Sequence, residues 1–367
     1  MGFEVKGPGP LLREALEKGT RLGRGGKGSI FVFAAGNGGV IGDSCAFSGH
    51  VNNIHTIAIS GVNWDGSVPA YTEQCAAIMA VTYGQDMFRY GKYKPPLVTA
   101  KGANDCTERF PGSSGTAAMA SGIIALALQA NPELTWRDVQ HLIARSSKPI
   151  TPPKNRPSVS RPRPTWIINA AGLKVSSHYG FGLMDAINMV EYARNWRTVP
   201  PQLSCEVKLD VSNSSRLAIR LRGDLHFTLS LSQDNCSIRY LEHMQVEVNL
   251  RFSRRGDLEM VSTSPSGSQS KLLYSRTIDS IAGFKNFTNW RVTSLHYWGE
   301  NPIGDWNITI RTRPRPWNTA GNGRVFGLKL ILYGTKEDPL ANNKDVKDET
   351  KTKRTETVNV ARREKGH

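Results

Sequence analysis

The sequence predicts two folded domains of different class: an α/β domain with a parallel sheet over residues 1–199, and an all-β sandwich over residues 200–335. Three observations support this prediction. Residues 29–35 form an apolar run of the kind found in strands buried on both faces of a parallel sheet. Residues 115–129 are rich in Ala, Leu and Ile without proline, which indicates a buried helix. After Pro200 and Pro201, polar and apolar residues alternate, which is typical of half-buried antiparallel strands.

The other elements of the first domain are predicted from caps and apolar runs. Residues 11–18 indicate a short helix that ends at Gly19. Thr135, with Asp138 three residues later, has the pattern of an N-cap that opens another helix. Strands that alternate with helices indicate an α/β layered fold. The remaining expected elements are two strands, residues 55–60 and 78–82, and an amphipathic helix, residues 183–194.

The second domain is predicted from six alternating segments, many of them separated by turn residues. This pattern favours an antiparallel sandwich. Residues 336–367 mix Lys, Arg, Asp and Glu with almost no large apolar side chains, which predicts a disordered charged tail. The six expected strands are residues 217–221, 227–231, 245–252, 258–263, 306–311 and 326–333.

Composition and charge exclude several classes of protein. The 367 residues are 39% hydrophobic and 21% charged, which is ordinary for globular domains and excludes collagen, coiled-coil and wholly disordered chains. The net charge of +16 permits contact with polyanions. The dense basic group at residues 148–163 is interleaved with prolines rather than aromatics, so we expect no nucleic-acid binding. Apolar stretches such as residues 122–130 are shorter than the roughly 20 residues of a membrane span, so we expect no transmembrane segment and no signal peptide in the chain.

The cysteines and the glycosylation sequons bear on the cellular compartment. An odd number of cysteines without a Cys-x-x-Cys pair argues against a zinc or thioredoxin-type site and leaves disulfides or buried thiols as alternatives. A cluster of N-glycosylation sequons after residue 200 favours an exported protein. The cysteines are Cys45, Cys75, Cys106, Cys205 and Cys236, and the sequon asparagines are Asn213, Asn235, Asn286 and Asn307.

Two local patterns could carry chemistry. Residues 112–122 place a serine at a glycine-rich turn that opens a hydrophobic helix, whose N-terminal N–H groups could stabilise the oxyanion formed when a serine attacks a carbonyl. The same serine could be an ordinary N-cap. Asn37 follows the first buried strand and could donate to an oxyanion, although Asn-Gly is also a common turn dipeptide. The local patterns leave both interpretations open.

Five segments together point to a known family. They are residues 29–39, 134–141, 178–186, 254–258 and 298–300. On these segments the chain, from about residue 7 to residue 335, resembles the proprotein convertases, the furin and kexin branch of the subtilisin-like serine proteases. The resemblance implies a subtilisin-like parallel sheet, truncated at its N-terminal side, followed by the β-sandwich called the P domain.

The resemblance assigns the catalytic roles that this chain can match. The family's nucleophile lies eight residues before the glycine of a Gly-Ile-Ile-Ala-Leu helix, which corresponds here to Ser114 and Gly122. The oxyanion-hole asparagine corresponds to Asn37. The family's catalytic aspartate and histidine lie upstream of the matched segment, and a serine without a base is a poor nucleophile. We therefore expect the chain alone to be inactive. Three neighbours depart from the family pattern: Ser113, Gly115 and Ala118.

Substrate-binding residues also follow from the resemblance. Ala34, Ala35 and Gly36 would form one wall of the substrate pocket. Family members prefer basic residues before the cleaved bond because acids line their pockets. Two of those acids are replaced in this sequence, by Ser48 and by Lys6. These replacements weaken the expectation that the chain recognises dibasic sites.

The resemblance implies a calcium site and a disulfide pattern. Asp43 and Glu73 match two carboxylates that hold calcium near the pocket in the family, and oxygen ligands suit Ca²⁺. A third ligand would lie upstream, so we expect an incomplete site and weak calcium binding. Family disulfides correspond to Cys45 with Cys75 and to Cys205 with Cys236, and Cys106 matches a cysteine whose partner lies upstream.

Two function classes remain at this stage. The first is a serine endopeptidase that cleaves precursor proteins at basic sites, present here as a fragment without the catalytic Asp and His. The alternative is an inactive pseudoprotease, or a protein-binding fragment that acts through the P domain. Both imply protein partners, a monomer, and a secretory-pathway or extracellular location. Polyanion binding through the Pro/Arg-rich segment is a third and weaker hypothesis.

Overall fold

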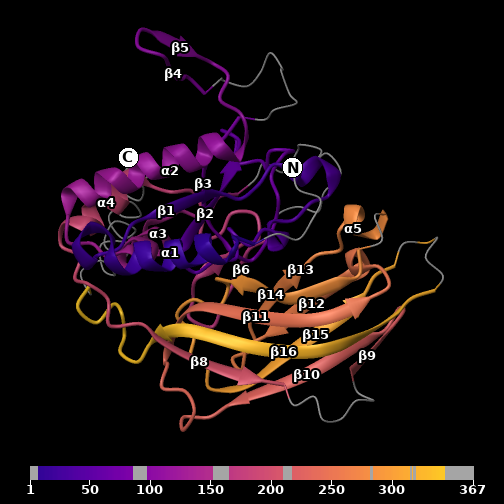
Figure 1. Cartoon of the computed structure of the whole chain (residues 1–367). Coiled ribbons are helices and arrows are strands. Elements are labelled where there is room, and N and C mark those ends of the chain that lie inside the picture. Colours follow the sequence, from indigo (N-terminus) through magenta and orange to yellow (C-terminus); the bar gives the residue numbers. More distant parts are fainter. Residues whose placement is uncertain are drawn as a thin grey trace, which may run out of the picture.

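A computed structural model of the chain describes residues 7–85, 97–151, 165–209, 217–281, 284–314, 316 and 320–343. An α/β layer formed by the first half of the chain lies on a β-sandwich formed by the second half (Figure 1). Lys6, Asn213, most of the basic segment 148–163 and most of the charged tail fall outside the described residues. The α/β and all-β classes predicted from the sequence are both confirmed.

The α/β layer contains a parallel sheet of three strands in the order β1-β2-β3. These strands are β1 (Phe31–Ala34), β2 (Thr56–Val62) and β3 (Ile78–Tyr83). Phe31 pairs with Thr56, and Ala58 pairs with Ile78. Every residue of β2 is buried, which explains its unbroken apolar and small-residue sequence.

Four longer helices surround this sheet. The N-cap signal at Thr135 is confirmed, because the Thr135 and Asp138 side chains form a reciprocal capping box. Asp185 caps the last of these helices by accepting from the amide of Asn188. The helices are α1 (Pro10–Leu22), α2 (Gly112–Ala130), α3 (Trp136–Ser146) and α4 (Ala186–Arg194). Short pieces complete the layer: η1 (Gly23–Gly26), η2 (Gly38–Ile41), η3 (Cys45–Phe47), β4 (Thr99–Lys101), β5 (Asp105–Thr107), β6 (Ile167–Ile168) and β7 (Lys174–Val175).

Helix α2 contains no charged residue along its whole length. Within the described residues, it alone is long and apolar enough to cross a membrane by length and composition. It packs against the parallel sheet and α4, and it buries Ala120, Ile124 and Ala127. Within the described residues, 39% of the apolar window of α2 is buried by this packing.

The second half forms two antiparallel sheets packed face to face. Alternating burial along β10 confirms the half-buried strands expected there. The first sheet has the order β10-β15-β12-β13, with β10 (Asp224–Leu231), β15 (Gly304–Thr312), β12 (Leu258–Thr263) and β13 (Gln269–Leu273). The second has the order β14-β11-β16-β8, with β14 (Asn286–Ser294), β11 (Tyr240–Phe252), β16 (Asn322–Thr335), β8 (Leu203–Lys208) and β9 (Ala218–Arg220) beside β16. Helix α5 (Thr277–Ile281) and η5 (Arg255–Asp257) complete the domain.

Each domain buries a large side chain of the other domain in its hydrophobic core. Phe47 of the α/β layer is buried within the hydrophobic cluster of the sandwich. Trp298 of the sandwich is buried within the cluster of the α/β layer, where its ring meets those of His141 and Phe181 edge-on. The hydrophobic core is therefore continuous across the change of fold class.

Candidate active site

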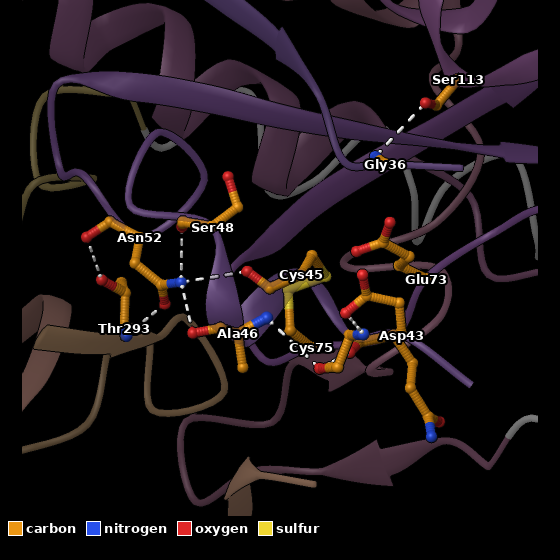
Figure 2. The surroundings of a disulfide bond; sticks show 12 residues. Gly36, Asp43, Cys45, Ala46, Ser48, Asn52, Glu73, Cys75, Ser113 and Thr293 are labelled. Carbon is orange, nitrogen blue, oxygen red and sulfur yellow. Dashed lines mark hydrogen bonds between the residues drawn. A yellow bond between two sulfur atoms is a disulfide. The ribbon is translucent and has the colours of Figure 1, made fainter. Parts of the chain in front are cut away.

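The candidate site begins where β1 ends and α2 starts. Asn37 Oδ1 accepts hydrogen bonds from the Ser113 amide at 2.8 Å and from the Ser113 hydroxyl at 2.9 Å. The amide of Gly36 donates to the same hydroxyl at 3.3 Å, as Figure 2 shows. We call the arrangement of Gly36, Asn37 and Ser113 the oxyanion corner. It ties the carboxyl end of a buried strand to the first turn of an apolar helix.

This arrangement orients the Asn37 amide. Because Oδ1 is occupied by Ser113, the Nδ2 group is the part of the amide left to donate, and it has no partner among the described residues. Gly112 has φ +85°, and a Cβ there would come within 3.2 Å of Asn37 Oδ1. A glycine is therefore required beside the amide.

The two adjacent serines differ in their surroundings. The Ser113 side chain is fully buried, whereas Ser114 is exposed in the first turn of α2, where backbone N–H groups have no partner within the helix. The structure thus leaves the Ser114 hydroxyl open to solvent, beside the positive end of the helix dipole. No His, Asp or Lys side chain bonds to Ser114 within the described part of the chain. The positioning role of Ser113 was missed by the sequence analysis, which treated this residue only as a departure from the family pattern.

The loop that carries Ser48 begins beside the oxyanion corner, since a Cβ at Gly38 would lie 2.6 Å from Asp43 Cβ, and Figure 2 shows Ser48 further along this loop. Asn52 Nδ2 donates to the carbonyls of Cys45 at 3.0 Å, Ala46 at 3.1 Å and Ser48 at 2.8 Å, which closes the loop on itself. Asn52 Oδ1 accepts from the Thr293 amide at 2.8 Å. We call residues 43–52 the pocket loop. Asn52, whose side chain closes this loop, is itself bonded to the sandwich domain.

Aromatic contacts and a disulfide also fix the pocket loop. Trp290 Nε1 donates to the Ala46 carbonyl at 3.2 Å, and the Phe47 ring lies 6.0 Å from that of Phe287. Cys45 is bonded to Cys75. The second predicted disulfide, Cys205 with Cys236, also forms, and Cys106 is free and exposed. Both predicted pairings are present in the structure.

The two candidate calcium ligands lie close together. A Cβ at Gly38 would lie 3.0 Å from both Asp43 Oδ2 and Glu73 Oε1, and Figure 2 shows the two carboxylates side by side. Glu73 Oε1 accepts from the Gly38 amide at 2.8 Å. Arg276 of the sandwich donates from Nε and Nη2 to the two oxygens of Asp43 at 2.8 and 3.1 Å. The Arg276 guanidinium thus takes up both carboxylate oxygens of Asp43. Within the described residues, no group of three acid, His or Cys side chains lies close enough together to hold a metal ion. The described residues therefore do not fit a complete calcium site.

Arg276 belongs to a row of alternating charges formed by Asp43, Arg276, Asp279 and Arg255, which we call the charge ladder. It also bonds to Asp279 at 3.0 Å, and Asp279 in turn accepts from Arg255 at 2.9 Å. Burial opposes the charged form of Arg276, but Asp43, Asp279 and Glu73 outweigh it and raise its pKa. Arg255 and Asp257 are buried, so the Arg-Gly-Asp sequence is structural.

A second buried polar group joins the two domains. Glu242 of β11 accepts from Arg137 Nε at 3.0 Å and lies 2.9 Å from His141 Nε2. Despite full burial, these partners lower the pKa of Glu242. The adjacent His243 lies 2.8 Å from Gln140 Oε1, and burial lowers its pKa to about 3. The interface is thus built around neutral His243 and ionised Glu242.

The predicted glycosylation sites that the structure describes are all accessible. Asn235, Asn286 and Asn307 are exposed. Exposure is what a glycan acceptor requires, and modification of these residues stays a prediction.

Comparison with known proteins places this chain in a family. Residues 2–182 match the family model described as subtilase family, and residues 241–329 match the proprotein convertase P-domain. The chain is 40% identical over 341 residues to human proprotein convertase subtilisin/kexin type 4, covering 93% of this chain and 42% of that protein. It is also 40% identical to endoprotease bli-4 of Caenorhabditis elegans, over 91% of this chain and 34% of that protein. The chain thus spans less than half the length of these relatives.

A solved structure shows the same fold. The crystal structure of Aeromonas sobria serine protease with the chaperone ORF2 superimposes with a TM-score of 0.76 at 22% identity, covering 92% of this chain and 70% of that one. The two family models, the relatives and the two-domain fold agree with the resemblance seen in the sequence. The chain belongs to the subtilase family, in the proprotein convertase branch that carries a P domain.

Proposed function

We propose that this chain is the nucleophile-bearing part of a serine endopeptidase that cleaves precursor proteins. The observation that supports the proposal is the oxyanion corner, in which Ser113 fixes the Asn37 amide next to the exposed Ser114. A histidine and an aspartate supplied by residues outside those described would complete the triad. Without them, the chain alone is inactive in peptide hydrolysis.

The chemistry assigned to these residues is acyl transfer. Ser114 Oγ attacks the carbonyl carbon of the peptide and loses its proton to the missing base. The carbonyl oxygen becomes an oxyanion, which accepts from Asn37 Nδ2 and from the backbone N–H at the start of α2. The leaving amine takes a proton, and water then hydrolyses the acyl-enzyme. Every group named here except the base belongs to the described chain.

The pocket charges bear on substrate choice. Ser48 carries no charge, and Asp43 is neutralised by Arg276. Cleavage at basic sites is therefore proposed on family grounds, with weaker charge selection than acid-lined pockets provide. Weak calcium binding at the incomplete pair of Asp43 and Glu73, glycosylation and a secretory-pathway location are further family proposals, and the two disulfides fit an oxidising compartment.

The test is rescue of the missing base. The full chain is given an activated ester, with increasing imidazole as an external base, and the acyl-enzyme is mapped by mass spectrometry. We expect acylation at Ser114 that rises with imidazole, is absent in Ser114→Ala and is about 10² to 10³-fold slower in Asn37→Ala. Acylation at Ser113, or equal rates in Asn37→Ala, would overturn the site assignment. Peptide hydrolysis without imidazole that Ser114→Ala abolishes would overturn the proposed inactivity.

The alternative function, a protein-binding pseudoprotease, rests on one observation. No side chain able to act as a base contacts Ser114 within the described residues. If imidazole leaves Ser114 unreactive while the chain remains folded, the pseudoprotease is favoured.

A further inference from the structure

A basic hollow lies at one end of the second sandwich sheet, and none of the residues that line it belongs to the candidate active site. It encloses about 660 Å³, and its wall contains four cationic side chains and the ring of Phe326. The rest of the described wall is neutral, so no acidic side chain faces these cations. The four cations are Arg251, Arg254, Lys285 and Arg324.

None of the four cations has an ion-pair partner within the described residues. Nearby arginines differ in this respect, since Arg255 is paired with Asp279 and Arg313 with Asp224. The sequence explains part of the contrast, because it contains no acid between Asp305 and Glu337. The positive charge of the hollow is therefore uncompensated by the described part of the chain.

The strand register makes this charge costly. Strands β14, β11 and β16 lie side by side (Figure 1), and Arg251 of β11 is directly opposite Arg324 of β16. Like charges at directly opposite positions destabilise a sheet. Elsewhere in the same strand pair the register is complementary, since Glu247 is opposite Lys329 and their charges lie 3.5 Å apart. An external anion would remove the repulsion between the two arginines.

Phe326 adds an apolar surface to the hollow. It lies at a β-bulge in β16, between the paired residues Val325 and Gly327, and 58% of it is exposed. Bulges re-aim side chains, and this one leaves a large aromatic ring in solvent beside the cations. A flat ring next to several cations suits a ligand with both anionic groups and an apolar face. The pyranose ring of a sulfated sugar has both.

We propose that the basic hollow binds sulfated polysaccharide, with Arg251 and Arg324 contacting sulfate groups and Phe326 stacking on a sugar ring. Two disulfides fit an oxidising compartment outside the cytosol, where sulfated glycans, and not nucleic acids, are the abundant polyanions. A single aromatic residue also falls short of the successive stacking platforms that single-stranded nucleic acids use. This proposal does not depend on the peptidase assignment.

The test uses the full chain, produced without glycosylation so that Asn286, which lies opposite Arg251 across β14 and β11, carries no glycan. A heparin-derived octasaccharide is titrated at several salt concentrations. We expect Arg251→Gln with Arg324→Gln to lower the affinity at least about tenfold and to flatten the salt dependence. The control, Lys18→Gln with Arg21→Gln, removes two exposed charges of α1 and is expected to change affinity less than about twofold.

Two further measurements separate a site from general charge attraction. Phe326→Ala should weaken octasaccharide binding and leave the binding of a poly-glutamate peptide unchanged. The double arginine variant should unfold at the same temperature as the wild type or higher, because repulsion is removed. Equal binding of poly-glutamate, an oligonucleotide and the octasaccharide, or equal losses in the double variant and its α1 control, would overturn the proposal.

Discussion

The oxyanion corner and the pocket loop lie side by side but are held by different domains. Every bond described for the corner joins Gly36, Asn37 and Ser113 within the α/β layer. The pocket loop depends on the sandwich, through Arg276 on Asp43 and Thr293 on Asn52. The difference teaches that the sandwich supports the loop proposed to bind substrate, whereas the proposed reaction centre is held by bonds within the α/β layer.

The strongest test of this division is Arg276→Ala. The change leaves Asp43 and fully buried Asp279 without their shared cation, and removing one member of a buried ion pair costs about 3–5 kcal/mol. Urea unfolding measures the free energy of unfolding. As the control, Arg194→Ala removes an ion pair whose two side chains are both 58% exposed, and it should change that value by less than about 0.5 kcal/mol. Equal effects would mean that the charge ladder does not hold the pocket loop.

A smaller and more local effect is expected for Asn52→Ala. The change removes three donations to carbonyls of the pocket loop and one acceptor for the sandwich, so we expect a loss of about 2–3 kcal/mol. Hydrogen exchange should show faster exchange of residues 45–52 and unchanged exchange at the start of α2. Ser113→Ala is the reverse control, because it should slow acylation of Ser114 and leave the loop protected. Exchange that rises equally in both regions would show that the two are one unit.

Acid should weaken the interface between the domains. His243 has a folded pKa near 3 and an ordinary unfolded value near 6.5, so its contribution is complete above pH 6.5 and declines as the pH falls towards 3. Between pH 6.5 and 5 this amounts to about 2 kcal/mol of unfolding free energy. His243→Gln should flatten the pH dependence, as measured by urea unfolding at each pH. An unchanged slope would exclude His243 as its source.

The sequence predicts well what depends on neighbouring residues. The helix that begins after Thr135 was placed from its cap, and β1 to β3 from apolar runs, because these signals are local. Strands β8, β13 and β14 were not predicted. Their segments have mixed polarity and obtain their stability from pairing with distant strands.

The candidate site divides in the same way. The roles of Ser114 and Asn37 were predicted from the family resemblance, and they stay predictions, although the structure does bring the two segments together. The bond from Arg276 to Asp43 joins residues 233 positions apart, so no local pattern could have shown it. The part played by Ser113 was hidden for a different reason, since a buried serine and a reactive serine have the same letter in the sequence.

The exchange of Phe47 and Trp298 between the two clusters has a consequence for folding. Each cluster lacks a large side chain until the other domain is in place, so neither half can complete its packing first. The protein should melt as one cooperative unit, with a single calorimetric peak whose enthalpy equals the van't Hoff value. Separately expressed halves would each expose apolar surface that the other half normally covers. We expect each half to aggregate when it is produced without the other.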